Sequence, residues 1–248
     1  MIKMNIVILL TGCIVPNTDD VLAIKDIQTR KKQYIDAINW YLTNTPYKVV
    51  FGENSGTDIS NEISKDYLDR VEFITFESKP ILPDRGKGYK EMEIIEACIN
   101  ESTFIENAQV VVKGTGRLIL KNIMSLTRLM PRRNDYFIYS WMSTKKVMCD
   151  SRFFFCSPKF LREFVAEYKE KVHKRSNFEE NLALCIASRN NVLYYFPVIS
   201  CDIDGLGGGF GVRYNKTRFQ YFKSSLICML KHVLFSFGYW PKEFQHYE

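Results

Sequence analysis

The chain has 248 residues, 46% of them hydrophobic and 25% charged, which suits one large globular domain with or without a small appendage and excludes large-scale disorder. Its formal net charge of +6 suits partners that carry phosphate or anionic lipid headgroups, and without a basic low-complexity tail we do not expect nucleic acid as a partner. Seven cysteines without Cys-x-x-Cys spacing and three histidines without a metal-binding pattern indicate reduced thiols in a cytoplasmic protein and argue against a zinc site or a Ser-His-Asp hydrolase.

The first part of the chain alternates apolar strands with helices. The predicted elements are strands at 4–10, 47–51 and 71–76 and helices at 26–42 and 60–68. Residues 6–13 mimic the lipidated signal of a lipoprotein, but their apolar core of about six residues is shorter than that of a signal peptide, so we predict a buried strand instead. This β-α-β-α-β order predicts an α/β fold with a mainly parallel central sheet flanked by helices.

The later part of the chain continues this alternation. The predicted elements are helices at 89–102, 158–172, from 177 onward and at 219–237, and strands at 109–113, 136–142, 145–149, 152–156 and 192–199. Glycines 205–211 form either a mobile lid over a ligand or a plain connector. No run reaches the roughly 18 apolar residues of a membrane span. We predict a catalytic-type domain over 1–212 and an extension over 213–248.

The strand at 47–51 ends abruptly in a polar loop. Glu53, Asn54, Ser55 and Asp58 follow it, and Thr11 ends the first strand. Because the carboxyl ends of parallel strands form the ligand crevice of an α/β sheet, a carboxylate, an amide and hydroxyls there can bind a ribose or a base. The same residue types also build turns that satisfy only their own backbone, and that interpretation stays open.

Two basic, glycine-containing loops are candidate phosphate sites. One is 113–117, which contains Lys113 and Arg117, and the other is 84–89, which contains Arg85 and Lys87 and precedes a predicted helix. Backbone amides beside glycines and the positive end of a helix both attract anions. The alternative is a pair of solvated turns, with the acids that follow at Glu91 and Glu93 serving the helix dipole.

Two further groups of acids are candidates. Glu179 and Glu180 open the predicted helix after Asn177, where they either activate a hydroxyl or simply favour the helix dipole. Asp150 and Arg152, and separately Asp202 and Asp204, could bind a donor sugar or a divalent metal.

These segments, taken in chain order over roughly residues 4–200, resemble glycosyltransferases of the GT-A fold. The loop after residue 51 resembles the nucleotide loop of that family, with Glu53 in place of the usual Asp. Residues 113–117 stand where the family has a metal-binding Asp-x-Asp and contain no acid, and 178–180 resemble the Phe-Glu-Asp motif of its inverting members. The resemblance is to a bacterial branch without Asp-x-Asp that builds capsular polysaccharide or O-antigen and includes galactofuranosyltransferases.

The resemblance implies a GT-A-like fold, a UDP-sugar donor and a glycan or lipid-linked glycan acceptor. Glu180, with Glu179 beside it, would deprotonate the acceptor, and Lys113 and Arg117 would stabilise the leaving UDP. No cofactor would then be required, although Mn²⁺ or Mg²⁺ stays open. A sugar-nucleotide nucleotidyltransferase is the alternative enzyme, although 11–16 lacks its Gly-rich basic loop, and a non-catalytic assembly scaffold is the alternative from another class.

The C-terminal segment 214–247 mixes aromatic, aliphatic and basic residues. Such a helix suits the inner surface of the cytoplasmic membrane, where anionic lipids attract Lys and Arg. It equally suits a helix docked on the sheet, and the sequence leaves both interpretations open.

Overall fold

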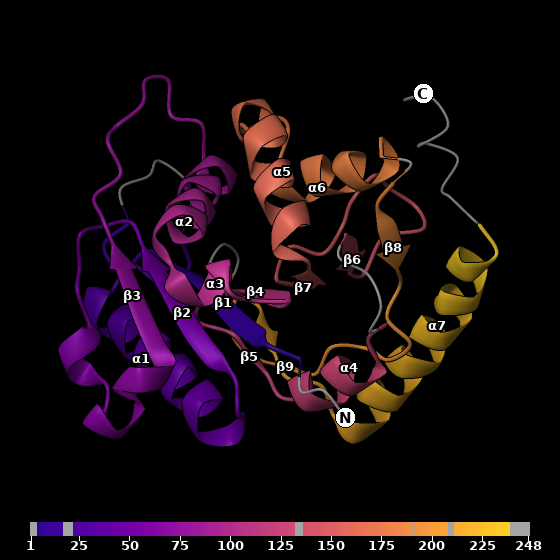
Figure 1. The fold of residues 1–248 in the computed structure, drawn as a ribbon, viewed down its shortest axis with the longest axis horizontal. Coiled ribbons are helices and arrows are strands. Elements are labelled where there is room, and N and C mark those ends of the chain that lie inside the picture. The colour runs from indigo at the N-terminus through magenta and orange to yellow at the C-terminus, as the bar shows by residue number, and fades with distance from the viewer. Residues whose placement is uncertain (1–3, 17–21, 132–135, 190, 208–210, 239–248) are drawn as a thin grey trace.

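The computed structural model describes residues 4–16, 22–131, 136–189, 191–207 and 211–238 (Figure 1). The strands are β1 (Ile6–Gly12), β2 (Lys48–Glu53), β3 (Val71–Thr75), β4 (Val110–Thr115), β5 (Ile119–Leu120), β6 (Phe137–Tyr139), β7 (Phe153–Cys156), β8 (Leu193–Tyr195), β9 (Ile203–Leu206) and β10 (Arg213–Tyr214). The α-helices are α1 (Ile27–Asn44), α2 (Lys87–Glu101), α3 (Thr103–Glu106), α4 (Ile123–Leu129), α5 (Pro158–Tyr168), α6 (Phe178–Ala187) and α7 (Arg218–Ser236), and the 3₁₀ turns are η1 (Ser60–Glu62), η2 (Lys65–Arg70) and η3 (Lys169–Lys171).

A seven-stranded sheet in the order β3-β2-β1-β4-β7-β6-β8 forms the centre of the molecule. β3, β2, β1 and β4 are parallel to one another, β7 runs antiparallel to both β4 and β6, and β6 and β8 are parallel. The predicted α/β class with a mainly parallel central sheet is therefore confirmed. The carboxyl ends of β1, β2 and β4 meet at one edge of this sheet, where the candidate loops begin.

Helices cover the two faces of the sheet, because the central strands alternate apolar side chains to both sides. Val7 and Leu9 of β1 pack in the core beneath α2, α5 and α6. Ile8 and Leu10 pack on the other side, in the core that includes α1 and α4. Every residue of β1 is buried, as the continuous apolar run predicts, and Figure 1 shows α2 and α5 on one side of the sheet and α1 on the other.

A smaller sheet, β10-β9-β5, lies beyond the exit of β4. Its strands are two to four residues long and are absent from the predicted elements. β9 supplies the beginning of the predicted glycine loop, and residues 208–210 of that loop lie outside the described residues. Arg213 and Tyr214 pair with β9, so the predicted extension is hydrogen-bonded to the preceding segment from its first residues.

Several predicted elements differ from the observed ones for local reasons. The helix predicted at 60–68 is replaced by η1 and η2, since Ile63 is extended between them and the Ser64 side chain caps η2. No strand forms at 145–149, where only the isolated bridge of Met142 with Cys149 is present. The strand predicted at 192–199 ends at Tyr195, shortly before Pro197, which cannot donate to a ladder.

The helix α7 extends along the outside of the molecule (Figure 1). A capping box of Thr217 and Gln220 starts it, and Phe235 stacks on Phe196 near β8. Among its described residues Cys228 is the one that is buried. No helix in the described part of the chain has both the length and the apolar character to span a bilayer.

Candidate functional site

Two adjoining cavities lie at the carboxyl edge of the central sheet. The one we call the β1 cavity has a volume of about 190 Å³ and is bounded by Thr11, Arg117 and the first turns of α2. The other, the α2 cavity, measures about 340 Å³ and extends over the loop at 77–85. Cys13, Asn54 and Lys90 line both. The pair therefore forms one concave site where parallel strands end, which is the usual position for a ligand in such sheets.

Glu53 shapes the loop after β2 instead of facing either cavity. Its side chain is fully buried, and its carboxylate accepts hydrogen bonds from the backbone N–H groups of Ile14 (2.8 Å), Ser55 (2.9 Å) and Thr57 (2.9 Å). Glu53 is therefore not placed to make the direct contact with a nucleoside that the sequence predicts. Glu53 instead joins the loop after β1 to the loop after β2, because one buried carboxylate satisfies donors from both.

Asn54 is the residue of that loop that lines both cavities. It is 4% exposed, and its Nδ2 donates to Ser78 Oγ at 3.0 Å. Its Oδ1 is buried and has no hydrogen-bond partner among the described residues, a state that costs about 1–3 kcal/mol unless a donor arrives. Ser55 lines the α2 cavity, whereas Asp58 is exposed, lies outside both and accepts from Ser60 N at 2.8 Å in a local turn.

Arg117 is the cation of the β4 exit loop that lines the β1 cavity. Its guanidinium lies 5.8 Å from the centroid of the Tyr34 ring, and its Nε and Nη1 are buried without a hydrogen-bond partner in the described ranges. Burial lowers the pKa of Arg117, with the Tyr34 side chain acting in the opposite direction. An arginine stays protonated in proteins, so the cavity contains a charged group with unused donors.

Other basic side chains converge on the same cavity from α1 and α2. Lys87 and Lys90 line it at the start of α2, and Arg30 lines it from α1. Arg30 was missed by sequence reasoning; it is buried and donates to the carbonyl oxygens of Cys13, Ile14 and Ile24, which holds the chain after β1 in place. A single arginine on a helix gives no sequence signal of this role. Glu91 is the one acid that lines the cavity among the described residues.

Lys113 is neutralised beneath the cavity and does not line it. Its ammonium is fully buried, lies 2.5 Å from Glu91 Oε1, and donates to the carbonyl oxygen of Ser151 at 2.7 Å. Thr11 Oγ1 donates to the same Glu91 oxygen at 2.8 Å. The prediction that Lys113 would face phosphate directly therefore requires correction, because its charge is already paired. Glu91 likewise has a role beyond the helix dipole.

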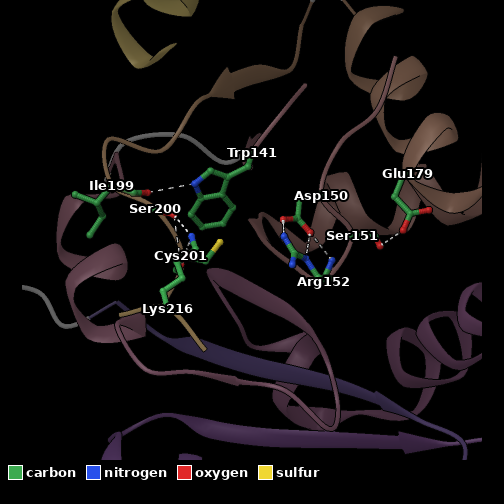
Figure 2. Close-up of polar contacts among 9 residues, drawn as sticks. All are labelled: Trp141, Asp150, Ser151, Arg152, Glu179, Ile199, Ser200, Cys201 and Lys216. Carbon is green, nitrogen blue, oxygen red and sulfur yellow. Dashed lines mark hydrogen bonds and ion pairs between the residues drawn. The ribbon is translucent and has the colours of Figure 1, made fainter. Parts of the chain in front are cut away.

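The same network reaches the first turn of α6. Ser151 Oγ donates to Glu179 Oε1 at 2.5 Å, a contact visible in Figure 2. Asn177 caps the helix, with its side chain accepting from Glu180 N at 2.8 Å. Thr11, Glu91, Lys113, Ser151 and Glu179 thus form one continuous polar chain from β1 to α6. Glu180 is partly exposed and lines neither the β1 cavity nor the α2 cavity.

Arg85 and Asp150 each form an ion pair with another side chain. Arg85 lines the α2 cavity, but its guanidinium pairs with Glu170 and lies 4.1 Å from the Tyr89 ring centroid. Arg152 binds Asp150 with two hydrogen bonds, Nε to Oδ1 at 2.9 Å and Nη2 to Oδ2 at 2.6 Å (Figure 2). Burial opposes the charge of Arg152, yet the Asp150 carboxylate raises its pKa above the ordinary value.

Asp150 and Arg152 line a third cavity, which we call the β9 cavity, of about 280 Å³. Its lining is joined to that of the β1 cavity at the end of β4, where the N–H of Thr115, a residue of the β1 cavity, donates to the carbonyl of Arg152 at 2.9 Å. Asp202, the other predicted acid, lies 3.4 Å from Lys121 and outside this cavity's lining. Asp204 lies on β9 and pairs in register with Ile119.

The exit of β4 does not fit a divalent metal. Residues 114–117 offer no carboxylate, and Arg117 brings a positive charge to the position that a cation would need. The cavity's acid, Glu91, is already paired with Lys113. Across the described ranges no cluster of three or more His, Cys, Asp or Glu residues could hold a metal ion.

No protein-family model and no curated protein matches the chain. Among solved structures, the galactosyltransferase LgtC in complex with donor and acceptor sugar analogues aligns at 9% identity and a TM-score of 0.47 over 76% of this chain and 73% of that one. GlyE, a glycosyltransferase of Streptococcus pneumoniae, aligns at 13% and 0.46 over 77% and 45%. A cytidylyltransferase from Leptospira borgpetersenii aligns at 9% and 0.45 over 78% and 76%. With identities this low and TM-scores below 0.5, the function has to be argued from the site itself.

Proposed function

We propose that the chain is a glycosyltransferase that moves a sugar from a UDP-sugar to a glycan or lipid-linked glycan in the synthesis of a bacterial capsular polysaccharide or O-antigen. This proposal rests mainly on the two adjoining cavities, which contain both a hydrogen-bond acceptor and hydrogen-bond donors that lack partners among the described residues. Asn54 presents an acceptor and Arg117 presents cationic donors. A nucleoside diphosphate supplies the complements of both, because its base and ribose donate hydrogen bonds and its phosphates accept them.

The volumes and charges favour a particular orientation of the donor. The α2 cavity, lined by Asn54 and Ser55, falls within the range of roughly 300–1,000 Å³ typical of small-molecule sites and would take the nucleoside. The β1 cavity, with Lys87, Lys90 and Arg117, would take the diphosphate. The donor sugar, galactofuranose or galactose in this proposal, would then lie at the end of β4.

The reaction would be a single inverting displacement. The carboxylate of Glu180, which lies in the first turn of α6 outside the lining of the donor cavities, would remove the proton of an acceptor hydroxyl at their margin. The hydroxyl oxygen would then form a bond to the anomeric carbon as the bond from that carbon to the phosphate oxygen breaks. UDP leaves with the bonding electrons, and its added charge is stabilised by the Arg117 and lysine donors without a required metal. Glu179, held by Ser151, would fix the position of this first turn.

The exposed side of α7 supports association with the inner face of the cytoplasmic membrane as a further part of the proposal. Most of its exposed apolar residues recur at intervals of three and four, which places them on one broad helical stripe. The exposed large apolar residues of α7 and its C-cap are Phe219, Phe222, Leu226, Ile227, Met229, Leu230, Val233, Leu234 and Phe237. Arg218 and Lys223 are exposed beside them, as expected for a helix at an anionic lipid surface.

The test is a panel of nucleotides and nucleotide sugars, measured for binding by calorimetry and for hydrolysis and transfer, each with and without EDTA. We expect UDP and a UDP-sugar to bind in EDTA, and Glu180→Gln to abolish transfer while UDP affinity stays unchanged. Glu179→Gln is the matched variant one residue away. Synthesis of a nucleotide sugar from UTP and a sugar 1-phosphate would identify a nucleotidyltransferase instead, and absence of any nucleotide binding would leave the scaffold alternative.

Membrane association is tested separately by sedimentation with vesicles of phosphatidylcholine, with or without phosphatidylglycerol. We expect the chain to sediment with the anionic vesicles and Leu230→Glu to prevent this without changing UDP affinity. If the parent chain and the Leu230→Glu variant were recovered equally in the supernatant, the exposed face of α7 would serve another purpose.

A further inference from the structure

We propose that the β9 cavity binds an acidic group, a carboxylate or a phosphate, carried by the acceptor glycan. The identification of the ligand as an acceptor glycan rests on the proposed transferase function. The cavity's preference for an anion follows from its own residues. Its lining includes Trp141, Asp150, Arg152, Tyr214 and Lys216. Neither the cavity nor its charge was predicted from the sequence, where Asp150 and Arg152 were candidates to bind a donor sugar or a divalent metal.

The charges in the cavity do not cancel. Asp150 is its one acid among the described residues, and both carboxylate oxygens are occupied by the Arg152 guanidinium. Arg213 and Lys216 line the same cavity, and in the described part of the chain neither has an acidic partner within ion-pair distance. The cavity therefore retains the charge of two cations, and an anionic ligand would be attracted to it.

Lys216 is the cation best held in place. Its ammonium donates to Ser200 Oγ at 2.6 Å and to the carbonyl oxygen of Cys201 at 3.2 Å, as Figure 2 shows. Both acceptors are neutral, and an ammonium has three N–H donors, so one donor and the whole positive charge remain for a ligand. Ser200 and Cys201 are themselves buried, which fixes the position of the ammonium.

The remaining lining suits a sugar ring. Trp141 is anchored by a hydrogen bond from Nε1 to the carbonyl of Ile199 at 3.2 Å, and Tyr214 lies with its ring centroid 4.7 Å from the Arg152 guanidinium carbon. Aromatic surfaces with a few polar groups are typical of sites for small polar ligands. At about 280 Å³ the cavity lies just below the range of roughly 300–1,000 Å³ typical of sites for drug-sized ligands, so its ligand would be small, such as a single sugar residue.

The position of the cavity connects it to the proposed reaction centre. Asp150 and Arg152 line the β9 cavity, while Ser151 between them binds Glu179 (Figure 2). The carbonyl oxygen of Ser151 also accepts a hydrogen bond from Lys113. Arg152 also contacts the end of β4 through Thr115. An acceptor held by its acidic group at Lys216 would thus lie beside the strand end at which the donor sugar is expected.

The experiment compares the binding of two matched probes to the full chain by calorimetry, p-nitrophenyl β-glucuronide and p-nitrophenyl β-glucoside. We expect the glucuronide to bind about tenfold or more tightly, as one charge-assisted hydrogen bond predicts, and its affinity to fall with added salt. Lys216→Met should remove that preference and Lys216→Arg should restore most of it. Lys32→Met, on the outer surface of α1, is the control and should change nothing. A glucoside 6-phosphate probe distinguishes a phosphate from a carboxylate as the preferred group.

Equal affinities for the two glycosides, or a glucuronide preference that survives Lys216→Met with normal thermal stability, would overturn the proposal. UDP binding is measured on the same samples, so the two ideas can fail separately. A chain that binds the glucuronide through Lys216 but does not bind UDP would keep this site and lose the transferase function. A chain that binds UDP but shows no glucuronide preference would do the reverse.

Discussion

The buried pair of Lys113 and Glu91 permits a quantitative test of the network beneath the β1 cavity. The Lys113 side chain is fully buried, and the Glu91 side chain is 22% exposed. Glu91→Gln keeps an oxygen that Thr11 and Lys113 can contact, but it leaves a buried ammonium without a counter-charge. Removing one partner of a buried ion pair costs about 3–5 kcal/mol, and the partial exposure of Glu91 places the expectation near the lower end, at about 3 kcal/mol.

This loss corresponds to a fall in the melting temperature of roughly 6–12 °C for a chain of this size. Lys113→Met should cost less, since the apolar side chain fits beside Phe154 and Phe178 and the remaining carboxylate reaches water. The double variant should be more stable than Glu91→Gln alone. Calorimetric melting of all three, with the surface variant Glu96→Gln as control, provides the measurement, and the control should lose less than about 1 kcal/mol.

The reasoning would be refuted if Glu91→Gln melted within about 2 °C of the parent chain, a shift that corresponds to less than about 1 kcal/mol. It would also be refuted if Lys113→Met were the more damaging of the two, because that order would mean that the ammonium, and not its missing counter-charge, supplies the stability.

Three further variants test the cavities themselves. Arg117→Gln should weaken UDP binding by roughly 10- to 100-fold in calorimetry while uridine affinity stays constant, since the guanidinium is expected to contact phosphate alone; a parallel loss for uridine would contradict this. Gly116→Ala should lower both the melting temperature and UDP affinity, because a methyl group there would lie 2.7 Å from the carbonyl oxygen of Thr11 and overpacking costs about 1–3 kcal/mol. Burial raises the pKa of Glu93 above its ordinary 4.5, so the folded chain binds more protons than the unfolded chain just above that pH and stability falls as pH rises. Glu93→Gln should therefore flatten the dependence of melting temperature on pH. An unchanged slope of melting temperature against pH would show that Glu93 is not the source of this dependence.

The elements that the sequence predicted well are those whose signal is local and long. β1 is a continuous apolar run, α1 has a 3.6-residue period and starts at a capping aspartate, Asp26, and both appear within two residues of their predicted positions. The missed elements are short. β5 and β10 each contain two residues and exist only because β9 pairs with both, which no local pattern encodes.

The site was predicted in its location but not in its pairings. Asn54 and Arg117 follow strand ends, a position readable from the sequence, and both line the β1 cavity. The burial of Lys113 and its partner Glu91 depends on how α2 packs over β4, and residues 22 positions apart give no sign of that contact. Glu53 resembled a ligand for the same reason that Asn54 did, and only the loop geometry separates a carboxylate that closes the loop from an amide that faces the cavity.

The distribution of charge around β4 indicates which groups can serve a leaving diphosphate. Lys113 belongs to the polar chain that reaches Glu179, yet Glu91 cancels its charge, so it can position neighbouring groups but adds little net attraction. The attraction has to come chiefly from Arg117, which reaches the cavity from the loop after β4 with Nε and Nη1 unpaired within the described residues. Lys87 and Lys90 line the same cavity from the first turns of α2, where Lys90 also lies 4.0 Å from Asp84. Lys113 then joins β4, α2 and the segment before β7. The groups that we propose to contact phosphate line the β1 cavity instead. This division explains why both Glu91→Gln and Arg117→Gln should impair the protein by different routes, the first through melting temperature and the second through UDP affinity at unchanged stability.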